Sequence, residues 1–196
     1  MLCCRKCYIS QQGPCRVFGE GPADALVMSI SEAAGEDEFR LGRPYVGRAG
    51  KYWEGMLSSA GLCRDQIYVT NCIKSHPLWD GVSNKISPDY QEVHACQPFL
   101  FRQIEIIKPQ FILVFGKTAA YSLGLLRKSD ALGPILGERP IFDYACSDGV
   151  KRQAQMVVTY HPSYLMRGGK EKDNWKSYLH LCRAKEIVNG MVSGQT

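Results

Sequence analysis

Polar side chains that could take part in hydrolysis come at or just after the ends of three short apolar runs. They are Glu32 and Glu38 after residues 25–30, Asn71 after 66–70, and His161 after 156–159. A carboxylate can orient water, an amide can both donate and accept hydrogen bonds, and an imidazole can donate to a developing negative charge. Together these groups suit the hydrolysis of a bond whose leaving group departs as an anion.

Each of these residues alone also has a structural explanation. The two acidic residues could belong to a solvated loop that caps the next helix, and Asn71 could simply end a strand in a turn. His161, which precedes a proline, could be an ordinary hydrogen-bonded loop histidine. The segment Gly116-Lys117-Thr118 lacks the earlier glycine of a phosphate-binding loop, so nucleotide hydrolysis is not expected. The expectation of a hydrolytic site therefore rests on the convergence of these residues.

The cysteine content favours metal or cluster ligation over a disulfide framework. The chain has nine cysteines, an odd number, and it starts with a cysteine-rich segment rather than a basic segment followed by an apolar run. Cys4 and Cys7 form a Cys-x-x-Cys pair. Cys63, Cys146 and Cys182 stand apart in apolar or helical settings and are interpreted as ordinary thiols.

Length and composition predict one globular domain over residues 1–196, with residues 1–20 as a cysteine-rich cluster segment. No run approaches the roughly 18 consecutive apolar residues of a membrane span, so we expect a soluble, intracellular, monomeric protein. The net charge of +5 permits a polyanionic partner. Arg43 and Arg167 lie close to Gly and aromatic residues, as in loops that meet phosphates and bases.

Apolar runs alternating with helical patterns predict an α/β fold. We expect strands at residues 25–30, 66–70, 111–115 and 156–159, and helices at 49–60, 89–107, 117–126 and 173–188. We expect loops at 79–88 and 127–139. This alternation predicts a three-layer α/β/α sandwich with a central four-stranded parallel sheet. Ligands of such sheets bind beyond the carboxyl ends of the strands, which is where the candidate residues lie.

A series of motifs along the chain resembles family 4 uracil-DNA glycosylases, which contain an iron–sulfur cluster. The motifs are FGEGP at 18–22, EAAGEDE at 32–38, GRPYVGRAG at 42–50, YVTN at 68–71, CQPFL at 96–100, PQFILVFG at 109–116 and YHPSYL at 160–165. They cover nearly the whole chain. The resemblance implies a base-excision repair enzyme that flips uracil out of DNA and hydrolyses its N-glycosidic bond, leaving an abasic site.

The resemblance also implies roles for individual residues in the uracil pocket. Tyr45 takes the place of the phenylalanine that stacks on the flipped uracil, and Gly35 lies in the loop held against the base. Asn71 matches the amide that reads the uracil edge, and a mispaired contact with cytosine there would cost about 1–3 kcal/mol. His161 matches the histidine that donates to a uracil carbonyl oxygen, and losing such a donor typically costs roughly 100-fold in rate.

Further roles follow from the same resemblance. Glu32 and Glu38 match two acidic positions of the first motif, and either could orient the attacking water, with Glu38 preferred. Leu165 lies where glycosylases place the apolar wedge that fills the gap left by the flipped nucleotide, although a core leucine is an equal alternative. Ser163 and Arg167 could hold backbone phosphates beside it.

Three of the four cysteines that hold the family's cluster are present. Cys4, Cys7 and Cys96 fall on cluster positions, whereas the fourth position is Ser75. The resemblance implies an iron–sulfur cluster of the 4Fe–4S type with an altered fourth ligand. A three-thiolate cluster, a zinc ion and no metal at all remain open.

Several residues near position 75 could replace the missing thiolate. His76 ranks first, because it is adjacent and because imidazole replaces thiolate in some iron–sulfur centres. Cys72 ranks second, since three residues of extended strand place it roughly 10 Å away on the opposite face. Ser75 itself comes third, and Cys15 is a distant possibility.

The first motif departs from the family pattern at Ser31, Ala33 and Ala34, where Gly, Gly or Ala, and Pro are usual. A larger residue at position 31 could narrow the pocket, and the loss of proline makes the turn less preorganised. Two alternatives therefore stay open: a glycosylase for another deaminated base, and a weakly active or inactive nucleic-acid-binding relative. The expected partner is uracil-containing DNA, with replication or repair proteins as further candidates and no membrane. We expect the protein in the cytoplasm, associated with the nucleoid.

Overall fold

The computed structural model describes residues 4, 6–7, 17–76, 90–168 and 170–193. Cys15 and the expected loop at 79–88 lie outside the described residues. In chain order the elements are β1 Val27–Ala33, α2 Glu36–Leu41, α3 Arg48–Ser59, η1 Arg64–Gln66, β2 Ile67–Ile73, α4 Tyr90–Ile107, β3 Phe111–Phe115, α5 Lys117–Ser122, η2 Gly133–Ile135, β4 Ile141–Ala145, β5 Lys151–Thr159, α6 Pro162–Met166 and α7 Glu171–Ser193.

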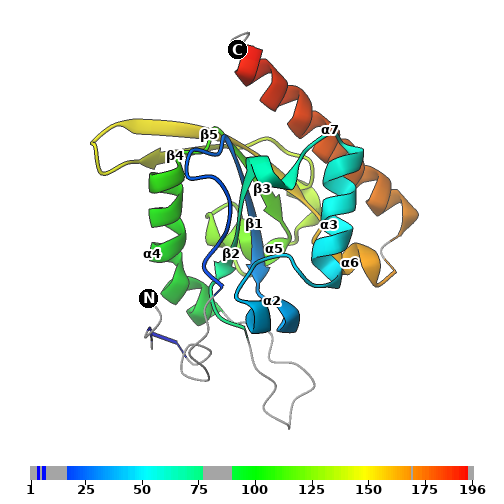
Figure 1. Ribbon diagram of the computed structural model, residues 1–196, viewed down its shortest axis with the longest axis horizontal. Helices are drawn as coiled ribbons and strands as arrows, with labels where there is room; N and C mark the ends of the chain where they lie inside the picture. The colour runs from blue at the N-terminus through cyan, green and yellow to red at the C-terminus, as the bar shows by residue number, and fades with distance from the viewer. Residues whose placement is uncertain (1–3, 5, 8–16, 77–89, 169, 194–196) are drawn as a thin grey trace.

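The strands form one sheet with the order β2-β1-β3-β5-β4. The first four strands of this order are mutually parallel, and β4 pairs antiparallel with β5. Helices α4 and α5 pack on one face of the sheet, while α3, α6 and α7 lie on the other (Figure 1). The predicted α/β/α sandwich and its four parallel strands are therefore confirmed.

Strand pleating divides the buried side chains into two cores. Met28, Ile30 and Val114 pack under α4 and α5, whereas Val27, Val69 and other residues of opposite parity pack under α3 and α7. This is the period-2 alternation of a sheet that is covered on both faces. The same alternation decides which face each candidate residue can serve.

The fifth strand was not predicted. β4 and the first half of β5 form a hairpin around Gly149, whose φ is +77°. Every second residue of β4 is exposed, and β5 begins with Lys151, Arg152 and Gln153. Since this edge hairpin buries little, its sequence lacks the continuous apolar run that marked the other strands.

Several predicted boundaries were also wrong. β1 and β2 continue to Ala33 and Ile73, so Ser31, Glu32 and Asn71 lie inside strands rather than after them. No helix was predicted over the segments that form the short helices α2 and α6, and α5 ends four residues before its predicted end. Short helices bury too few residues to show a helical period in the sequence. No helix within the described ranges has the length and apolar content that crossing a bilayer requires.

Candidate active site

Ser31 and Asn71 lie side by side at the carboxyl ends of β1 and β2. They are partners in the parallel register and are 1% and 2% exposed. Their parity places them on the sheet face that packs against α3 and α7, the face that also carries Phe115 at the end of β3. A polar pair is therefore buried at the sheet edge where ligands of parallel sheets bind.

His161 caps the N-terminus of α6 and reaches this pair. Its Nδ1 accepts a hydrogen bond from the backbone N–H of Ser163 at 3.1 Å, and its Nε2 lies 2.7 Å from the Ser31 hydroxyl oxygen. Because Nδ1 is an acceptor, the proton of a neutral His161 ring is on Nε2. The imidazole therefore directs an N–H donor at the carboxyl end of β1.

Gly116 allows His161 to sit close to β3. A Cβ atom at position 116 would lie 3.2 Å from the His161 Cβ, and the φ angle of Gly116 is +88°. A side chain would be strained at this φ and would crowd the histidine. The Gly116-Lys117-Thr118 segment thus serves the packing of the imidazole.

Asn71 has an amide donor with no partner. Its Nδ2 is fully buried, and no hydrogen-bond acceptor lies within reach of it among the described residues. A buried unsatisfied donor costs about 1–3 kcal/mol. A ligand carbonyl at this position would remove that cost.

The Tyr45 ring lies on the same side of the sheet. It packs on Trp53 with a ring-centroid distance of 4.6 Å, and it lies edge-on to Phe115 with a ring-centroid distance of 6.5 Å. Its hydroxyl is buried close to Ser31 but lacks a hydrogen bond of good geometry, and burial raises the pKa of this phenol strongly. Only 4% of the residue is exposed, so the ring can present little more than one edge or face to a ligand.

Glu38 holds the loop between β1 and α2. Its carboxylate accepts hydrogen bonds from the backbone N–H groups of Gly35 and Tyr45, and the Gly35 contact satisfies the backbone N–H of the N-cap residue at the start of α2. Burial raises the pKa of this carboxyl above its ordinary value, although the two N–H donors oppose that shift. The Glu38 carboxylate therefore links the backbone of Gly35 to that of Tyr45 through hydrogen bonds.

Glu32 belongs to the opposite face of the sheet. Its carboxylate accepts a hydrogen bond from the Thr118 hydroxyl of α5 at 2.6 Å, and its backbone carbonyl accepts one from the Cys72 thiol. The pleat sends the side chains of Ser31 and Glu32 to different faces. Of the two acidic candidates, Glu38 is the one that the structure brings to Tyr45.

The three candidates for DNA contact differ in exposure. Leu165 is only 4% exposed and packs inward, so it cannot act as a wedge without moving, whereas its neighbour Tyr164 is 43% exposed. The backbone N–H of Ser163 donates a hydrogen bond to His161, and Arg167 is exposed at the end of α6. The alternative that Leu165 is a core residue describes its position in this structure.

The cysteine candidates are partly assembled. Cys4 and Cys7 lie close enough to Cys96 for their charges to act on it, while burial raises the pKa of the Cys96 thiol. Cys96 also accepts a hydrogen bond from the Lys74 backbone N–H. Within the described ranges, however, no three His, Cys, Asp or Glu side chains stand close enough to hold a metal ion as placed.

The candidates for a fourth ligand are engaged in different ways. The Nδ1 of His76 lies 2.7 Å from the Ala34 carbonyl oxygen, to which it can only donate, so in a neutral ring Nε2 carries the lone pair that a ligand needs. Burial raises the pKa of the Cys72 thiol to about 12, which disfavours the thiolate that a metal needs. Ser75 is buried beside them.

Lys74 is a buried cation that the sequence reading missed. It has no exposed surface, and its ammonium group donates to the Thr70 hydroxyl at 2.7 Å, to the Asn71 carbonyl at 2.6 Å and to the Gln103 side chain. Burial lowers its pKa to about 7. The sequence signal was the position of Lys74 directly after the buried strand β2. Lysine is almost never fully buried unless it is paired, so a lysine at this place indicates polar partners.

The chain is similar to known proteins over most of its length. Residues 18–181 match the sequence model of a family described as the uracil DNA glycosylase superfamily. A type-4 uracil-DNA glycosylase of Archaeoglobus fulgidus is 38% identical over 190 residues, which are 95% of this chain and 92% of that protein. Type-4 uracil-DNA glycosylases of Pyrobaculum aerophilum and Thermotoga maritima are 34% and 35% identical, over 84% of this chain in each case and over 80% and 78% of their own lengths.

Proposed function

The chain belongs to the uracil-DNA glycosylase superfamily, and from that premise we propose that it removes uracil from DNA by hydrolysing the N-glycosidic bond. The observation that carries the proposal is a pair of donors at the carboxyl ends of the strands, the Nε2–H of the half-buried His161 and the buried, unpartnered Nδ2 of Asn71. Uracil has two carbonyl oxygens that can accept from them.

In the proposed reaction, water attacks C1′ of the flipped nucleotide while the bond from C1′ to N1 of uracil breaks. The uracil leaves as an anion whose charge is shared with its carbonyl oxygens. The His161 Nε2–H donates to the oxygen on which charge develops, and this lowers the barrier. Asn71 donates to the other carbonyl and selects the base, and Tyr45 supplies the apolar ring beside it.

Glu38 is our candidate for orienting the attacking water, and Glu32 is the second. Glu38 is connected to Tyr45 and Gly35, whereas Glu32 contacts α5 on the other face. A positioned carboxylate contributes typically 10²- to 10⁴-fold to such a step. We further propose that Ser163 and Arg167 contact backbone phosphates, and that Leu165 fills the gap in the duplex after α6 shifts.

We also propose that Cys4, Cys7 and Cys96 hold an iron–sulfur cluster of the 4Fe–4S type, with His76 as the fourth ligand. The electrostatic effect of Cys4 and Cys7 on Cys96 and the engagement of His76 through Nδ1 alone among the described residues support this set, with Cys72 or Ser75 as alternatives. Such a cluster would tie the cysteine-rich segment at 1–20 to α4 within one domain. Iron and sulfide analysis of the purified protein, with and without His76→Ala, tests the assignment, because loss of the fourth ligand should lower the iron content.

The proposed substrate also sets where the protein works and with what. We propose a monomer that acts on uracil-containing DNA in the cytoplasm, at the nucleoid, where replication or repair proteins could bind it. Size-exclusion chromatography tests the monomer, and co-purification from DNA-bound material tests the location.

Alkaline cleavage of a labelled uracil-containing oligonucleotide tests the main proposal. The protein should create abasic sites that break in alkali, and His161→Ala should lose roughly 100-fold or more in rate. His94→Ala is a matched control, because His94 is an exposed histidine bonded to Tyr121 on α5. If the parent protein and its variants all bind the oligonucleotide but none produces strand scission, the protein is a non-catalytic nucleic-acid-binding relative.

A second candidate function is excision of another deaminated base. The Ser31 hydroxyl lies between the Asn71 and His161 side chains, and it adds a polar group where the family usually has glycine. Competition between uracil-containing and hypoxanthine-containing oligonucleotides tests this alternative. If hypoxanthine is released faster than uracil, hypoxanthine is the preferred substrate.

A further inference from the structure

The backbone of Tyr45 adopts a conformation that an aromatic residue rarely holds. Its φ is +54°, in the left-handed region, where an L-residue with a bulky side chain pays of the order of 1–2 kcal/mol. The only other non-glycine residue with positive φ in the described part of the chain is Lys108, far from this site in sequence. Such a conformation persists only where neighbouring contacts enforce it.

Arg64 makes those contacts. Its Nη1 donates to the Tyr45 carbonyl at 3.0 Å, and its Nη2 donates to the Pro44 carbonyl at 2.7 Å. One guanidinium therefore holds two consecutive carbonyls, which constrains the peptide plane between them. Its planar fork suits this task, because its donors have a fixed relative geometry.

Arg64 also supports the side chain of Tyr45. Its guanidinium lies over the Trp53 ring at 5.6 Å from the centroid, and Trp53 in turn packs against Tyr45 with an angle of 31° between the rings. Gly50 completes the arrangement, since a Cβ at this position would come 2.0 Å from the Tyr45 carbonyl oxygen. The first turn of α3 can thus press against the same carbonyl that Arg64 binds.

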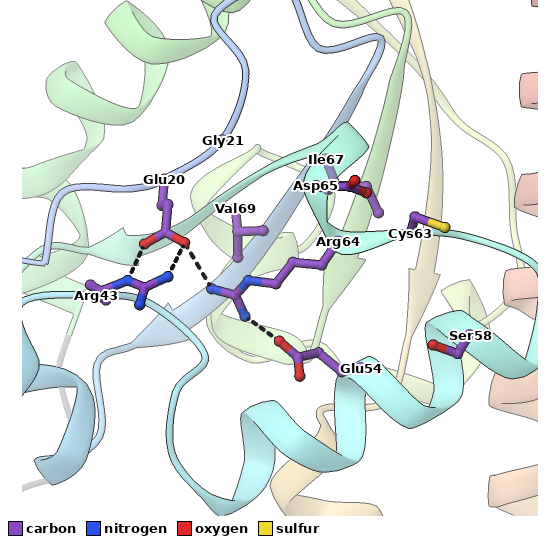
Figure 2. A pocket seen from close by; sticks show the side chains of 10 residues that line it. All are labelled: Glu20, Gly21, Arg43, Glu54, Ser58, Cys63, Arg64, Asp65, Ile67 and Val69. Atoms are coloured by element: carbon purple, nitrogen blue, oxygen red, sulfur yellow. Dashed lines mark hydrogen bonds and ion pairs between the residues drawn. The ribbon is translucent and has the colours of Figure 1, made fainter.

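Two carboxylates orient Arg64. Glu54 accepts from its Nη1 at 2.9 Å, and Glu20 lies 3.5 Å from its Nη2 while also taking two 2.7 Å hydrogen bonds from Arg43 (Figure 2). Glu20 is held in place by a backbone bridge to Val69 of β2. These four charged side chains meet in Figure 2. They line a cavity of about 520 Å³.

The cluster does not have the form of a free anion site. Each arginine is already paired with a carboxylate, and the two arginines and two glutamates cancel in charge. As exposed ion pairs they would also contribute little to stability. What distinguishes Arg64 from Arg43 is its pair of carbonyl contacts and its lower exposure, 21% against 60% for the side chain.

We propose that Arg64 is a positioning residue that holds Tyr45 in its left-handed conformation and so sets the aromatic ring that receives the flipped base. The proposal rests on the assignment of Tyr45 to base binding under the proposed function. Arg64 itself does not touch the substrate. It acts through the 44–45 backbone and through Trp53.

The activity test compares Arg64→Met and Arg64→Lys with the control Arg102→Met. Arg102→Met also removes one arginine from an ion pair with a glutamate, Glu105, but it lies on α4 and leaves the Tyr45 carbonyl untouched. We expect kcat/KM for a uracil oligonucleotide to fall about 10- to 100-fold in Arg64→Met, less in Arg64→Lys, and less than about twofold in Arg102→Met. Equal effects of Arg64→Met and Arg102→Met would overturn the proposal.

A double-mutant cycle separates positioning from general stability. In a Tyr45→Ala background the ring is gone, so Arg64→Met should cost less than about twofold more. A full additional loss in that background would show that Arg64 acts by another route. Should Arg64→Met fail to fold, Arg64→Lys carries the same cycle.

Fluorescence tests the arrangement without any activity. In a Trp79→Phe, Trp175→Phe background Trp53 is the only tryptophan, and Arg64→Met should shift its emission while Arg102→Met should not. If the protein releases no uracil but the Trp53 emission shifts, the proposed function fails and the positioning role of Arg64 stands. An unchanged Trp53 emission in Arg64→Met counts against the positioning role in either case.

Discussion

The Ser31 hydroxyl lies 2.7 Å from Nε2 of His161, and the two residues are 130 positions apart in the chain. Because Ser163 donates to Nδ1, the hydrogen bond to Ser31 uses the Nε2–H that we assign to the uracil carbonyl. Binding of the base must therefore exchange this bond for one to the substrate. The serine at this position competes with the substrate for the catalytic donor.

Ser31→Ala should accordingly raise kcat for uracil release by about threefold to tenfold, since a net hydrogen bond of about 1 kcal/mol no longer has to be exchanged. Steady-state kinetics on a uracil oligonucleotide measure the effect. Ser29→Ala is the control, because Ser29 lies two residues earlier on the same face and its buried hydroxyl has no hydrogen-bond partner among the described residues. A lower kcat in Ser31→Ala would mean that the hydroxyl helps rather than competes.

Asn71→Asp should weaken the preference for uracil. The change replaces the unpartnered amide donor by a carboxylate oxygen, which repels a uracil carbonyl but can accept from the amino group of cytosine. We expect the ratio of uracil to cytosine excision rates to fall roughly 10- to 100-fold, measured on paired oligonucleotides. Asn174→Asp is the control, since it keeps the acceptor that Tyr52 uses. An unchanged ratio would remove Asn71 from base selection.

Glu38→Gln should have opposite effects on stability and activity. Burial raises the pKa of Glu38 in the folded protein, so the folded state binds more protons than the unfolded state above the ordinary value of 4.5, and this group makes the protein less stable as the pH rises. The melting temperature of Glu38→Gln relative to the parent should therefore increase from pH 4 to pH 7. Uracil release should fall roughly 100-fold if the carboxylate orients water.

Glu36→Gln provides the comparison for Glu38, as Glu36 is an exposed residue of the same first turn of α2. It should change neither the melting temperature profile nor the rate. If the advantage of Glu38→Gln shrank as the pH rose, the pKa of the buried carboxyl would have to be lowered instead.

Lys74→Met should alter the pH dependence of unfolding in the opposite sense. The pKa of Lys74 falls to about 7 in the folded protein, against an ordinary value of 10.5. Between these values the unfolded state binds more protons, so this group makes the folded state more stable as the pH rises from about 7 to 10. Chemical denaturation at several pH values should show a flatter profile for Lys74→Met. The exposed Lys51→Met should follow the parent, and parallel profiles for parent and Lys74→Met would contradict the shift.

The sequence by itself determined the parallel sheet and the location of the site. The β-branched runs at β1, β2, β3 and β5 are continuous because both faces of the sheet are covered, and this burial is visible in local composition. Once the runs are located, the rule that ligands bind at the carboxyl ends of parallel strands places Asn71 and His161 together. The edge strand β4 was not predicted, because the strand of an exposed hairpin has no continuous apolar run.

Only the tertiary structure decided which side chains share a face and which contacts hold them. The prediction ended β1 before Ser31, but β1 continues to Ala33, and each further residue of strand alternates the face, so Glu32 turns to α5 while Ser31 meets His161. Arg64 reaches Tyr45 across 19 residues of loop and helix. Periodicity reports only on neighbours along the chain, whereas these contacts depend on how separate elements pack against one another.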